Sequence, residues 1–366
     1  MLPLKSKVFL FPYWAALKLR HLLYDKQIKK STEYSVPVIC VGNVTVGGTG
    51  KTPFTEMIIR RLEVYFPGEY HIMVLSRGYR RKTKGYRVVN AHEDYANVGD
   101  EPLQIKNKYP NVTVAVCEDR RVGIERLIKD FVGKQSNRKP VIILDDAFQH
   151  RRVKPVISVL LMSYNNPVYN DNLLPIGRLR DLPEQMKRAQ DIVVTNSPFY
   201  FSDEDYVNEQ AAAEFLERES PKWAKNLQMR PYQKLFFAAT VYTNPLPVFA
   251  DEADKRYLYS KSAVFFSGIA NDSHFREHIG ENFKVLDSLV FPDHCNFGKS
   301  DVSNINKLVA KYPLSVIFTT EKDSVRLANN RYLSNEVKRR LFYVPIETRI
   351  LSLEREREFI SSLTLK

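Results

Sequence analysis

The sequence predicts an α/β protein that is built on a doubly wound parallel sheet and carries a second, smaller α/β domain. Three observations predict it: apolar runs of strand length alternate with segments of helical periodicity from Val36 onward, a glycine-rich loop follows the first run, and the alternation restarts after residue 235. A charged, helix-rich stretch precedes the restart. We therefore expect an N-terminal helix within 1–30, a core domain over 31–235 and a smaller domain over 236–366.

The composition is that of an ordinary globular protein. The chain has 366 residues, of which 44% are hydrophobic and 27% are charged, and this length suffices for two domains with cores of their own. Its three cysteines, Cys40, Cys117 and Cys295, form no CxxC pair. This argues against a disulfide framework and a zinc site, and it favours a reducing compartment.

Positive charge is concentrated in the first part of the chain. The formal net charge is +13, and residues 1–90 alone hold 16 Lys and Arg against 5 Asp and Glu. So uneven a distribution predicts a polyanionic partner for this part. Nucleic acid, an anionic membrane surface and a phosphorylated substrate all fit, and composition does not choose among them.

Residues 1–30 predict a helix that is both apolar and basic. The apolar, aromatic run Val8–Leu17 follows two lysines and precedes Lys18 and Arg20. It is shorter than the roughly 20 residues that cross a bilayer, and no small-residue cleavage site follows it. Two interpretations remain open at this point: the helix lies in a membrane interface with its cations on anionic lipid, or it packs on the core with its basic face in water.

The first strand, over Val36–Val41, leads into the strongest functional motif of the chain. A glycine-rich loop follows it, and an apolar-periodic helix begins after the loop. Backbone N–H groups of such a loop bind phosphate, while Lys51 reaches the outer phosphates and Thr52 ligates magnesium. Thr45 stands where the strict pattern has glycine. The residues that we expect to bind a nucleotide triphosphate are Gly47, Gly48, Thr49, Gly50, Lys51 and Thr52.

A later strand, over Val141–Leu144, ends in Asp145 and Asp146. An acid at a strand end is the usual second half of a phosphate-loop site, where it holds magnesium or a magnesium-bound water. Two successive carboxylates at a buried strand end repel each other unless a cation or hydrogen-bond donors compensate them. Together with Lys51 and Thr52, they predict a Mg²⁺-dependent nucleotide site of the P-loop NTPase type.

Further strands are predicted in both domains, over Tyr70–Leu75, Val112–Val116, Ile157–Leu161 and Asp191–Thr195 in the first and over Ala263–Phe266, Val285–Val290 and Val316–Thr320 in the second. All three strands of the second domain end in polar clusters, which predicts a ligand-binding edge there as well. Asp100 and Glu101 begin a predicted helix, where the helix dipole favours acids without any catalytic role.

Seven motifs taken together resemble the lipid A 4′-kinase (tetraacyldisaccharide 4′-kinase) family of bacterial lipopolysaccharide synthesis. Their order and spacing agree with the family along most of the chain. The motifs are Val41–Asn43 with Gly47–Pro53, Ser76–Tyr79, Val98–Pro102, Asp145-Asp146 with Phe148–His150, Leu174-Pro175 with Leu179-Arg180, Phe291–His294 and Thr320–Asp323.

The resemblance implies transfer of the ATP γ-phosphoryl group to the 4′-hydroxyl of an acylated glucosamine disaccharide 1-phosphate in lipid A biosynthesis. ATP and Mg²⁺ would be the cofactors, and the partners would be this lipid and an anionic membrane surface, without nucleic acid. It further implies a peripheral enzyme on the cytoplasmic face of the bacterial inner membrane, with residues 1–30 as an interfacial helix. We also expect a monomer.

The resemblance also implies roles for individual residues. In that family the equivalents of Asp100 and His294 pair, so Asp100 would accept the proton of the 4′-hydroxyl and His294 would orient it or share the proton. Lys51 and Asp146 complete the expected catalytic set. The expected metal ligands are Thr52, Glu101 and Asp145. The expected substrate-binding residues are Asn43, Arg77, Gln149, His150 and Arg180.

The chain departs from the family pattern at places that remove no catalytic group. Ala147 stands where glycine is expected, Arg178 stands where proline is common, and Arg80-Arg81 stand where smaller residues often follow. These departures bear on head-group and acyl-chain preference, which therefore stay open.

Two other functions would use the same nucleotide site. A partition or targeting ATPase switch would bind ATP at Gly47–Thr52 and dock its basic N-terminus on a membrane, but such proteins usually carry lysine at the position of Val46. A nucleic-acid-stimulated ATPase would place the basic segment on phosphates, yet the chain has no recognisable nucleic-acid module. ATP turnover with the acylated disaccharide, with vesicles alone or with nucleic acid separates the three.

Overall fold

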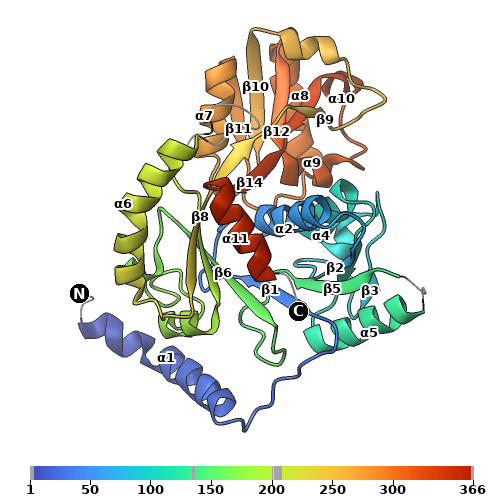
Figure 1. Cartoon of the computed structure of the whole chain (residues 1–366). Coiled ribbons are helices and arrows are strands. Elements are labelled where there is room, and N and C mark those ends of the chain that lie inside the picture. Colours follow the sequence, from blue (N-terminus) through green and yellow to red (C-terminus); the bar gives the residue numbers. More distant parts are fainter. Residues whose placement is uncertain (1–3, 134–136, 200, 202–207, 364–366) are drawn as a thin grey trace.

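The computed structural model describes residues 4–133, 137–199, 201 and 208–363, with side chains from residue 10 onward within these ranges. Two α/β domains stack on each other, and α1 lies along the far side of the larger one (Figure 1). The strands are β1 (Val38–Gly42), β2 (Tyr70–Ser76), β3 (Arg87–Val88), β4 (Thr113–Val116), β5 (Lys139–Leu144), β6 (Ile157–Ser163), β7 (Asp191–Thr195), β8 (Lys234–Tyr242), β9 (Leu246–Pro247), β10 (Ser262–Ser267), β11 (Lys284–Val290), β12 (Val316–Thr320), β13 (Leu341–Val344) and β14 (Ile346–Ile350). The helices are α1 (Leu4–Asp25), α2 (Lys51–Tyr65), α3 (Tyr95–Val98), α4 (Asp100–Lys108), α5 (Arg120–Val132), α6 (Glu209–Leu227), α7 (Ser273–Asn282), α8 (Lys299–Lys311), α9 (Glu321–Leu327), α10 (Asn335–Arg340) and α11 (Leu353–Leu363), with short 3₁₀ helices η1 (Val168–Asn170), η2 (Pro183–Arg188) and η3 (Lys255–Tyr259).

A nine-stranded sheet forms the larger domain, in the order β14-β8-β7-β6-β1-β5-β2-β4-β3. Neighbours from β8 to β4 run parallel, while β14 and β3 close the two edges antiparallel. β1 lies in the middle, where Val38 pairs with Ile142 of β5 and Cys40 pairs with Ser158 of β6. The chain passes there from one half of the sheet to the other, which is where doubly wound sheets bind ligands. The predicted doubly wound sheet is confirmed.

Helices cover both faces of this sheet, which explains why all five residues of β1 are buried and apolar or glycine. α2, α4 and α11 cover one face, where Phe54 and Phe359 belong to one core (Figure 1). α1, α5 and α6 supply Leu17, Leu127 and Trp223 to a second core on the other face. The phosphate loop, between β1 and α2, therefore starts from the most constrained part of the fold.

The smaller domain is a five-stranded sheet in the order β11-β10-β12-β13-β9. Its first four strands are parallel, and β9 runs antiparallel to β13. α8, α9 and α10 pack on one face around Ile305 and Leu327, while α7 and η3 pack on the other around Phe275 and Phe318. The carboxyl ends of β10, β11 and β12 carry the expected polar clusters, and α9, which begins at this edge, packs against α4 of the larger domain (Figure 1).

Sheet membership corrects the expected domain boundary at residue 235. β8 continues the large sheet to Tyr242, because its first half pairs with β7 up to Phe237 and its second half, Ala238–Tyr242, pairs with β14. The chain then builds the smaller domain and returns, so that β14 pairs with β8 and α11 packs on α2. The larger domain therefore includes residues 346–363, and two connections at 243–245 and Pro345 join the domains.

One side of α1 packs on the core of the larger domain, and another side of the helix exposes apolar rings. Leu17 joins the core, and the buried His21 Nε2 lies 2.6 Å from Asp181 Oδ1. Phe11 and Trp14 are 61% and 40% exposed, and their rings stack on each other. The side with Leu17 and His21 therefore fits the interpretation that α1 packs on the core, and the side with Phe11 and Trp14 fits the interpretation that it lies in a membrane interface. Within the described part of the chain no helix is long and apolar enough to span a membrane.

Candidate active site

The loop after β1 presents backbone to solvent. Gly47 and Gly50 have left-handed φ values of 101° and 70°, which glycine adopts without strain. A Cβ atom added at Gly47 or Gly48 would meet nothing within 4 Å, so the space beside the loop is open. Thr49 is buried, and α2 begins at Lys51. The loop can therefore place N–H groups and the positive end of a helix dipole on a phosphate chain.

Neighbouring elements fix the shape of this loop. Thr45, which replaces the glycine of the strict pattern, forms an antiparallel bridge with Leu179. The Asn43 amide donates to Thr49 Oγ1 at 2.7 Å. Thr195, at the end of β7, donates its hydroxyl to the Thr49 carbonyl at 3.0 Å. A loop held from both sides in this way is organised before any ligand binds.

Asp146 joins the phosphate loop to the loop that contains Arg180. Lys51 Nζ lies 4.0 Å from Asp146 Oδ1, and the Arg180 guanidinium binds both oxygens of Asp146. Arg180 also donates to Asn43 Oδ1 at 2.5 Å. Burial alone would raise the pKa of Asp146, but Lys51 and Arg180 hold it below its usual range. Four of the expected site residues thus meet at one place.

Asp145 is buried at the end of β5. The hydroxyls of Thr55 and Ser76 donate to its two carboxylate oxygens, each at 3.4 Å. The pKa of Asp145 is raised to about 7, mainly by burial and to a smaller extent by the charges of Glu101 and Asp146. A cation beside this carboxylate would lower the pKa again, because it favours the ionised form.

The oxygen groups around Asp145 fit a magnesium ion. Thr52, Asp145 and Glu101 offer hydroxyl and carboxylate oxygens, which are the ligands that Mg²⁺ prefers. The described residues contain no group of three or more acidic, His or Cys side chains placed to enclose a metal.

Cationic and amide side chains border the two aspartates. Arg120, for which the sequence predicted no role, is buried and donates to a carbonyl at the end of β5 at 3.3 Å. The pKa of His150 is lowered to about 4, mainly by burial and to a smaller extent by the charges of Arg120 and Arg77. This imidazole is therefore neutral at pH 7. Gln149 Nε2 donates to the Asn43 carbonyl at 2.5 Å. Of the expected substrate-binding residues, Gln149 and Arg180 therefore both contact Asn43 beside the phosphate loop.

Asp100 and His294 meet across the two domains. Asp100 is buried at the first position of α4, and His294 follows β11 of the smaller domain. His294 Nδ1 lies 3.3 Å from Asp100 Oδ2. Two loops beside Asp100 pack closely, because a Cβ added at Gly99 would come within 3.2 Å of Gly78 Cα. The structure thus brings the expected pair into contact.

Two residues for which no role was expected complete this contact. Arg326 Nε donates to Asp100 Oδ2 at 3.0 Å, and Lys322 Nζ lies 3.4 Å from His294 Nε2. Burial opposes ionisation of Asp100, but His294, Lys322 and Arg326 hold its pKa well below the usual range. Lys322 stands in the Thr-Glu-Lys-Asp motif, and Arg326 stands one helical turn after it. The family motif pointed to Lys322, but no local pattern in the sequence pointed to Arg326.

Glu101 connects the residues around Asp145 in the larger domain with the residues that meet at Asp100 and His294. Its Oε1 lies 3.2 Å from Lys322 Nζ of the smaller domain, and its charge raises the pKa of Asp145 in the larger one. The candidate active site therefore lies between the facing carboxyl edges of the two sheets.

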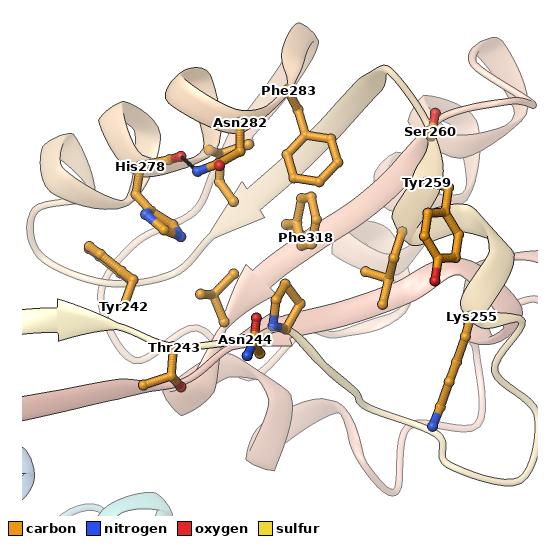
Figure 2. Close-up of a pocket in the computed structure, with 14 residues that line it drawn as sticks. Tyr242, Thr243, Asn244, Lys255, Tyr259, Ser260, His278, Asn282, Phe283 and Phe318 are labelled. Carbon is orange, nitrogen blue, oxygen red and sulfur yellow. Dashed lines mark hydrogen bonds between the residues drawn. The ribbon is translucent and has the colours of Figure 1, made fainter. Parts of the chain in front are cut away.

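The cavity in Figure 2 lies away from these residues. It has a volume of about 670 Å³ and is lined by α7, η3, β12 and one of the connections between the domains (Figure 2). Tyr242 stacks on His278 with 4.4 Å between ring centroids, and Phe283 lies 4.9 Å from Phe318. None of the expected site residues lines this cavity.

Known proteins that are similar to the chain share one name. A family model described as tetraacyldisaccharide-1-P 4′-kinase (LpxK) matches residues 7–364. The tetraacyldisaccharide 4′-kinase of Bacteroides thetaiotaomicron is 36% identical over 97% of this chain and 92% of its own length. That of Flavobacterium psychrophilum is 35% identical over 95% and 93%.

A solved structure is similar along the same length. The structure of LpxK from Aquifex aeolicus in complex with ATP is 25% identical and superimposes with a TM-score of 0.70, covering 99% of each chain. Since the family model spans nearly every residue and relatives exceed one third identity over most of both lengths, the chain belongs to the tetraacyldisaccharide-1-P 4′-kinase family.

Proposed function

We propose that the protein transfers the γ-phosphoryl group of ATP to the 4′-hydroxyl of an acylated glucosamine disaccharide 1-phosphate, a step of lipid A biosynthesis. Membership of the kinase family supports this reaction. One observation on the chain's own residues carries the proposal: the phosphate loop and the Asp100–His294 contact lie at facing edges of two sheets. This arrangement suits transfer between a nucleotide on one domain and an acceptor between the two.

The phosphate loop binds the triphosphate in this proposal. Its N–H groups and the start of α2 hold the phosphates, and Lys51 places a cation on the outer ones. Asp146 orients Lys51 from 4.0 Å, a separation that leaves the ammonium available to the nucleotide. Arg180, held by Asp146 and Asn43, stabilises the charge that spreads over the transferred group.

Thr52 with Asp145 or Glu101 would hold Mg²⁺, which neutralises phosphate charge when it is bound. Burial and neighbouring acids raise the pKa of Asp145 to about 7 even beside Lys51 and Arg120, and a cation bound there would favour its ionised form. Thr55 and Ser76 orient the Asp145 carboxylate through their hydroxyl hydrogen bonds.

Asp100 accepts the proton of the 4′-hydroxyl. The new bond forms between the 4′-oxygen and the γ-phosphorus, the bond from that phosphorus to the β-phosphate oxygen breaks, and ADP leaves. A carboxylate whose pKa is held low takes the proton late, when bond formation has acidified the hydroxyl. His294 shares or orients this proton. Arg77, Gln149 and His150 bind the disaccharide and its phosphate.

The membrane surface supplies the acceptor in this proposal. Phe11, Trp14 and Leu22 are exposed on α1, and Lys18 lies 5.8 Å from the Trp14 ring. Aromatic rings beside cations suit the interface of an anionic bilayer. We expect a monomer bound peripherally at the cytoplasmic face of the bacterial inner membrane.

The experiment compares ATP turnover by the purified full chain under three conditions: with the acylated disaccharide 1-phosphate in mixed micelles, with anionic vesicles alone, and with DNA or RNA. Mass spectrometry follows the lipid. We expect one phosphate to be added to the disaccharide at the rate at which ADP forms. Turnover that vesicles alone or nucleic acid stimulate, without any phosphorylated lipid, would replace the kinase by an ATPase switch or a nucleic-acid-stimulated ATPase.

A further inference from the structure

Arg326 is a buried arginine whose N–H groups bind partners in both domains. Its side chain is 1% exposed. Nη1 donates to Asp323 Oδ1 at 2.9 Å and to the Gly268 carbonyl at 3.2 Å, while Nε and Nη2 both donate to Asp100 Oδ2. Nη2 also lies 3.1 Å from His294 Nδ1. Four of the five guanidinium donors are thus bound to oxygen, and the fifth can donate to His294 Nδ1 only in the tautomer in which Nδ1 does not itself donate to Asp100.

The partners of Arg326 come from both domains. Asp323 and Gly268 belong to the smaller domain, and Asp323 is itself fixed there, because Gly268 N and Thr320 Oγ1 donate to its Oδ2 at 2.8 and 2.7 Å. One edge of the guanidinium plane is therefore immobilised within the smaller domain. The other edge faces Asp100, which begins α4 of the larger domain.

This geometry fixes the direction of one carboxylate oxygen. Asp100 Oδ2 receives Nε and Nη2 of Arg326 and lies 3.3 Å from His294 Nδ1, while Asp100 Oδ1 accepts the backbone N–H of Glu101 at 2.9 Å. The planar fork of Nε and Nη2 converges on this one oxygen and fixes its position, while the Glu101 N–H on Oδ1 limits rotation of the carboxylate; a lysine ammonium has only a single nitrogen to offer. The contact between Asp100 and His294 therefore depends on a third side chain.

We propose that Arg326 is a positioning residue for phosphoryl transfer: it fixes the Asp100 carboxylate against His294 when the two domains are together, and it does not touch substrate. The inference rests on the proposed function, in which Asp100 accepts the proton of the acceptor hydroxyl. Misplacement of a reacting group by about 1 Å costs on the order of 100-fold in rate, so the loss of Arg326 should appear in kcat. ATP binding at the phosphate loop should not change, because the contacts of Arg326 are to Asp100, Asp323, Gly268 and His294 and not to that loop.

Three variants of the full chain test the proposal, assayed with the acylated disaccharide in micelles and saturating ATP. Arg326→Ala should lower kcat about 100-fold and leave the KM for ATP within about twofold. Guanidinium chloride at tens of millimolar should restore part of this kcat, while NaCl at equal ionic strength should not. Arg326→Lys should keep the charge and still lose most of kcat. Arg340→Ala is the matched control.

Arg340 suits that purpose because it is equally buried in the smaller domain and donates to the carbonyls of Tyr312, Ser315 and Val309. Loss of the Arg340 side chain should lower the stability of the protein. Any change in kcat that accompanies it should not be reversed by guanidinium. A double-mutant cycle adds a second readout. In an Asp100→Ala background Arg326→Ala should cost nothing more, because the arginine acts through Asp100.

Several results would overturn the proposal. Wild-type kcat in Arg326→Ala, full activity in Arg326→Lys, or additive losses in the cycle would each show that the fork does not position Asp100. Where Arg326→Ala fails to fold, Arg326→Lys decides alone: a low kcat with an unchanged KM for ATP supports the proposal, and a normal kcat ends it. If the wild-type protein itself phosphorylates no lipid, the proposed function fails and not this inference.

Discussion

Lys108 links the three helices that carry residues of the site. Its Nζ lies 2.7 Å from Glu56 Oε2 on α2 and 3.0 Å from Glu321 Oε1 on α9, and Lys108 itself ends α4. The side chains of Glu56 and Glu321 are only 3% and 8% exposed. Burial disfavours the charge of Lys108, but the two carboxylates hold its pKa above the usual range. The ammonium thus compensates two buried acids at the domain interface.

Lys108→Met should therefore be strongly destabilising. Removing one partner of a buried ion pair costs about 3–5 kcal/mol, because it leaves buried charge uncompensated. Burial already raises the pKa of Glu56 to about 7, so Glu56 can take up a proton once Lys108 is gone. Because this protonation removes one of the uncompensated charges, we expect the lower end of the 3–5 kcal/mol range, about 3 kcal/mol. At roughly 2–4 °C per kcal/mol the expected fall in Tm is about 6–12 °C.

Differential scanning fluorimetry at pH 7 measures the shift, with Lys311→Met as the control. Lys311 Nζ lies 3.2 Å from Asp287, but these side chains are 64% and 37% exposed, so the control should shift Tm much less than Lys108→Met does. Adding Glu56→Gln to Lys108→Met should recover part of the loss. Equal shifts in Lys108→Met and Lys311→Met would refute the reasoning, since burial would then make no difference.

Three further predictions concern the nucleotide site, the membrane and pH. Lys51→Ala and Thr52→Ala should each remove most turnover, by a few kcal/mol of transition-state energy, with unchanged Tm, and near-normal turnover in Lys51→Ala would contradict the nucleotide-site assignment. Replacing Phe11 and Trp14 by Ser should weaken binding to anionic vesicles in a flotation assay and raise the KM for lipid, with an unchanged Tm, whereas unchanged binding would leave α1 as a core helix only. Burial raises the pKa of Asp191 to about 6, above its unfolded value, so wild-type stability should fall as pH rises from about 4 through 6. Asp191→Asn should remove this fall and be more stable at pH 7 by up to about 3 kcal/mol in urea titrations, and parallel pH profiles would show that burial does not perturb Asp191.

Local patterns along the chain predicted the phosphate loop and nine of the strands, but not β3, β8, β9, β13 or β14. The run Val36–Val41 is almost wholly apolar and precedes glycines, and the structure places β1 and the loop there. A strand and the loop after it depend on residues that are neighbours in the sequence, so one sequence is enough to predict them. The return of β14 to the large sheet depends instead on pairing with β8, which lies across the whole smaller domain in sequence. No local pattern encodes that partner, so the boundary was placed too early.

The candidate site shows the same limit. Lys51, Thr52 and Asp145 follow from strand ends and glycines alone, whereas Asp100 and His294 were paired only through the family resemblance. Arg326 was missed because a buried arginine on a short helix looks, in sequence, like any exposed cation. Its role became visible when Asp100, from the other domain, was found on the same guanidinium. Contacts across domains are therefore what the structure adds.

α1 illustrates a different limit. The sequence left open whether this helix faces lipid or core, because apolar and basic residues are mixed along it. The structure divides them: His21 is buried against Asp181, while Phe11 and Trp14 are exposed. Apolar residues lie on both sides of α1, because Leu10 and Leu17 are buried while Phe11 and Trp14 are exposed, so composition alone does not separate the two sides.

The central claim is that Asp100 and His294, on different domains, act as one unit in phosphoryl transfer. The most direct test is a double-mutant cycle on kcat, with purified lipid substrate and saturating ATP. Asp100→Ala should lower kcat with little loss of ATP affinity, and His294→Ala should do the same less severely. The double variant should be little worse than Asp100→Ala alone, because groups that act together are strongly non-additive. Fully additive losses would contradict the account, even if the kinase activity itself were confirmed.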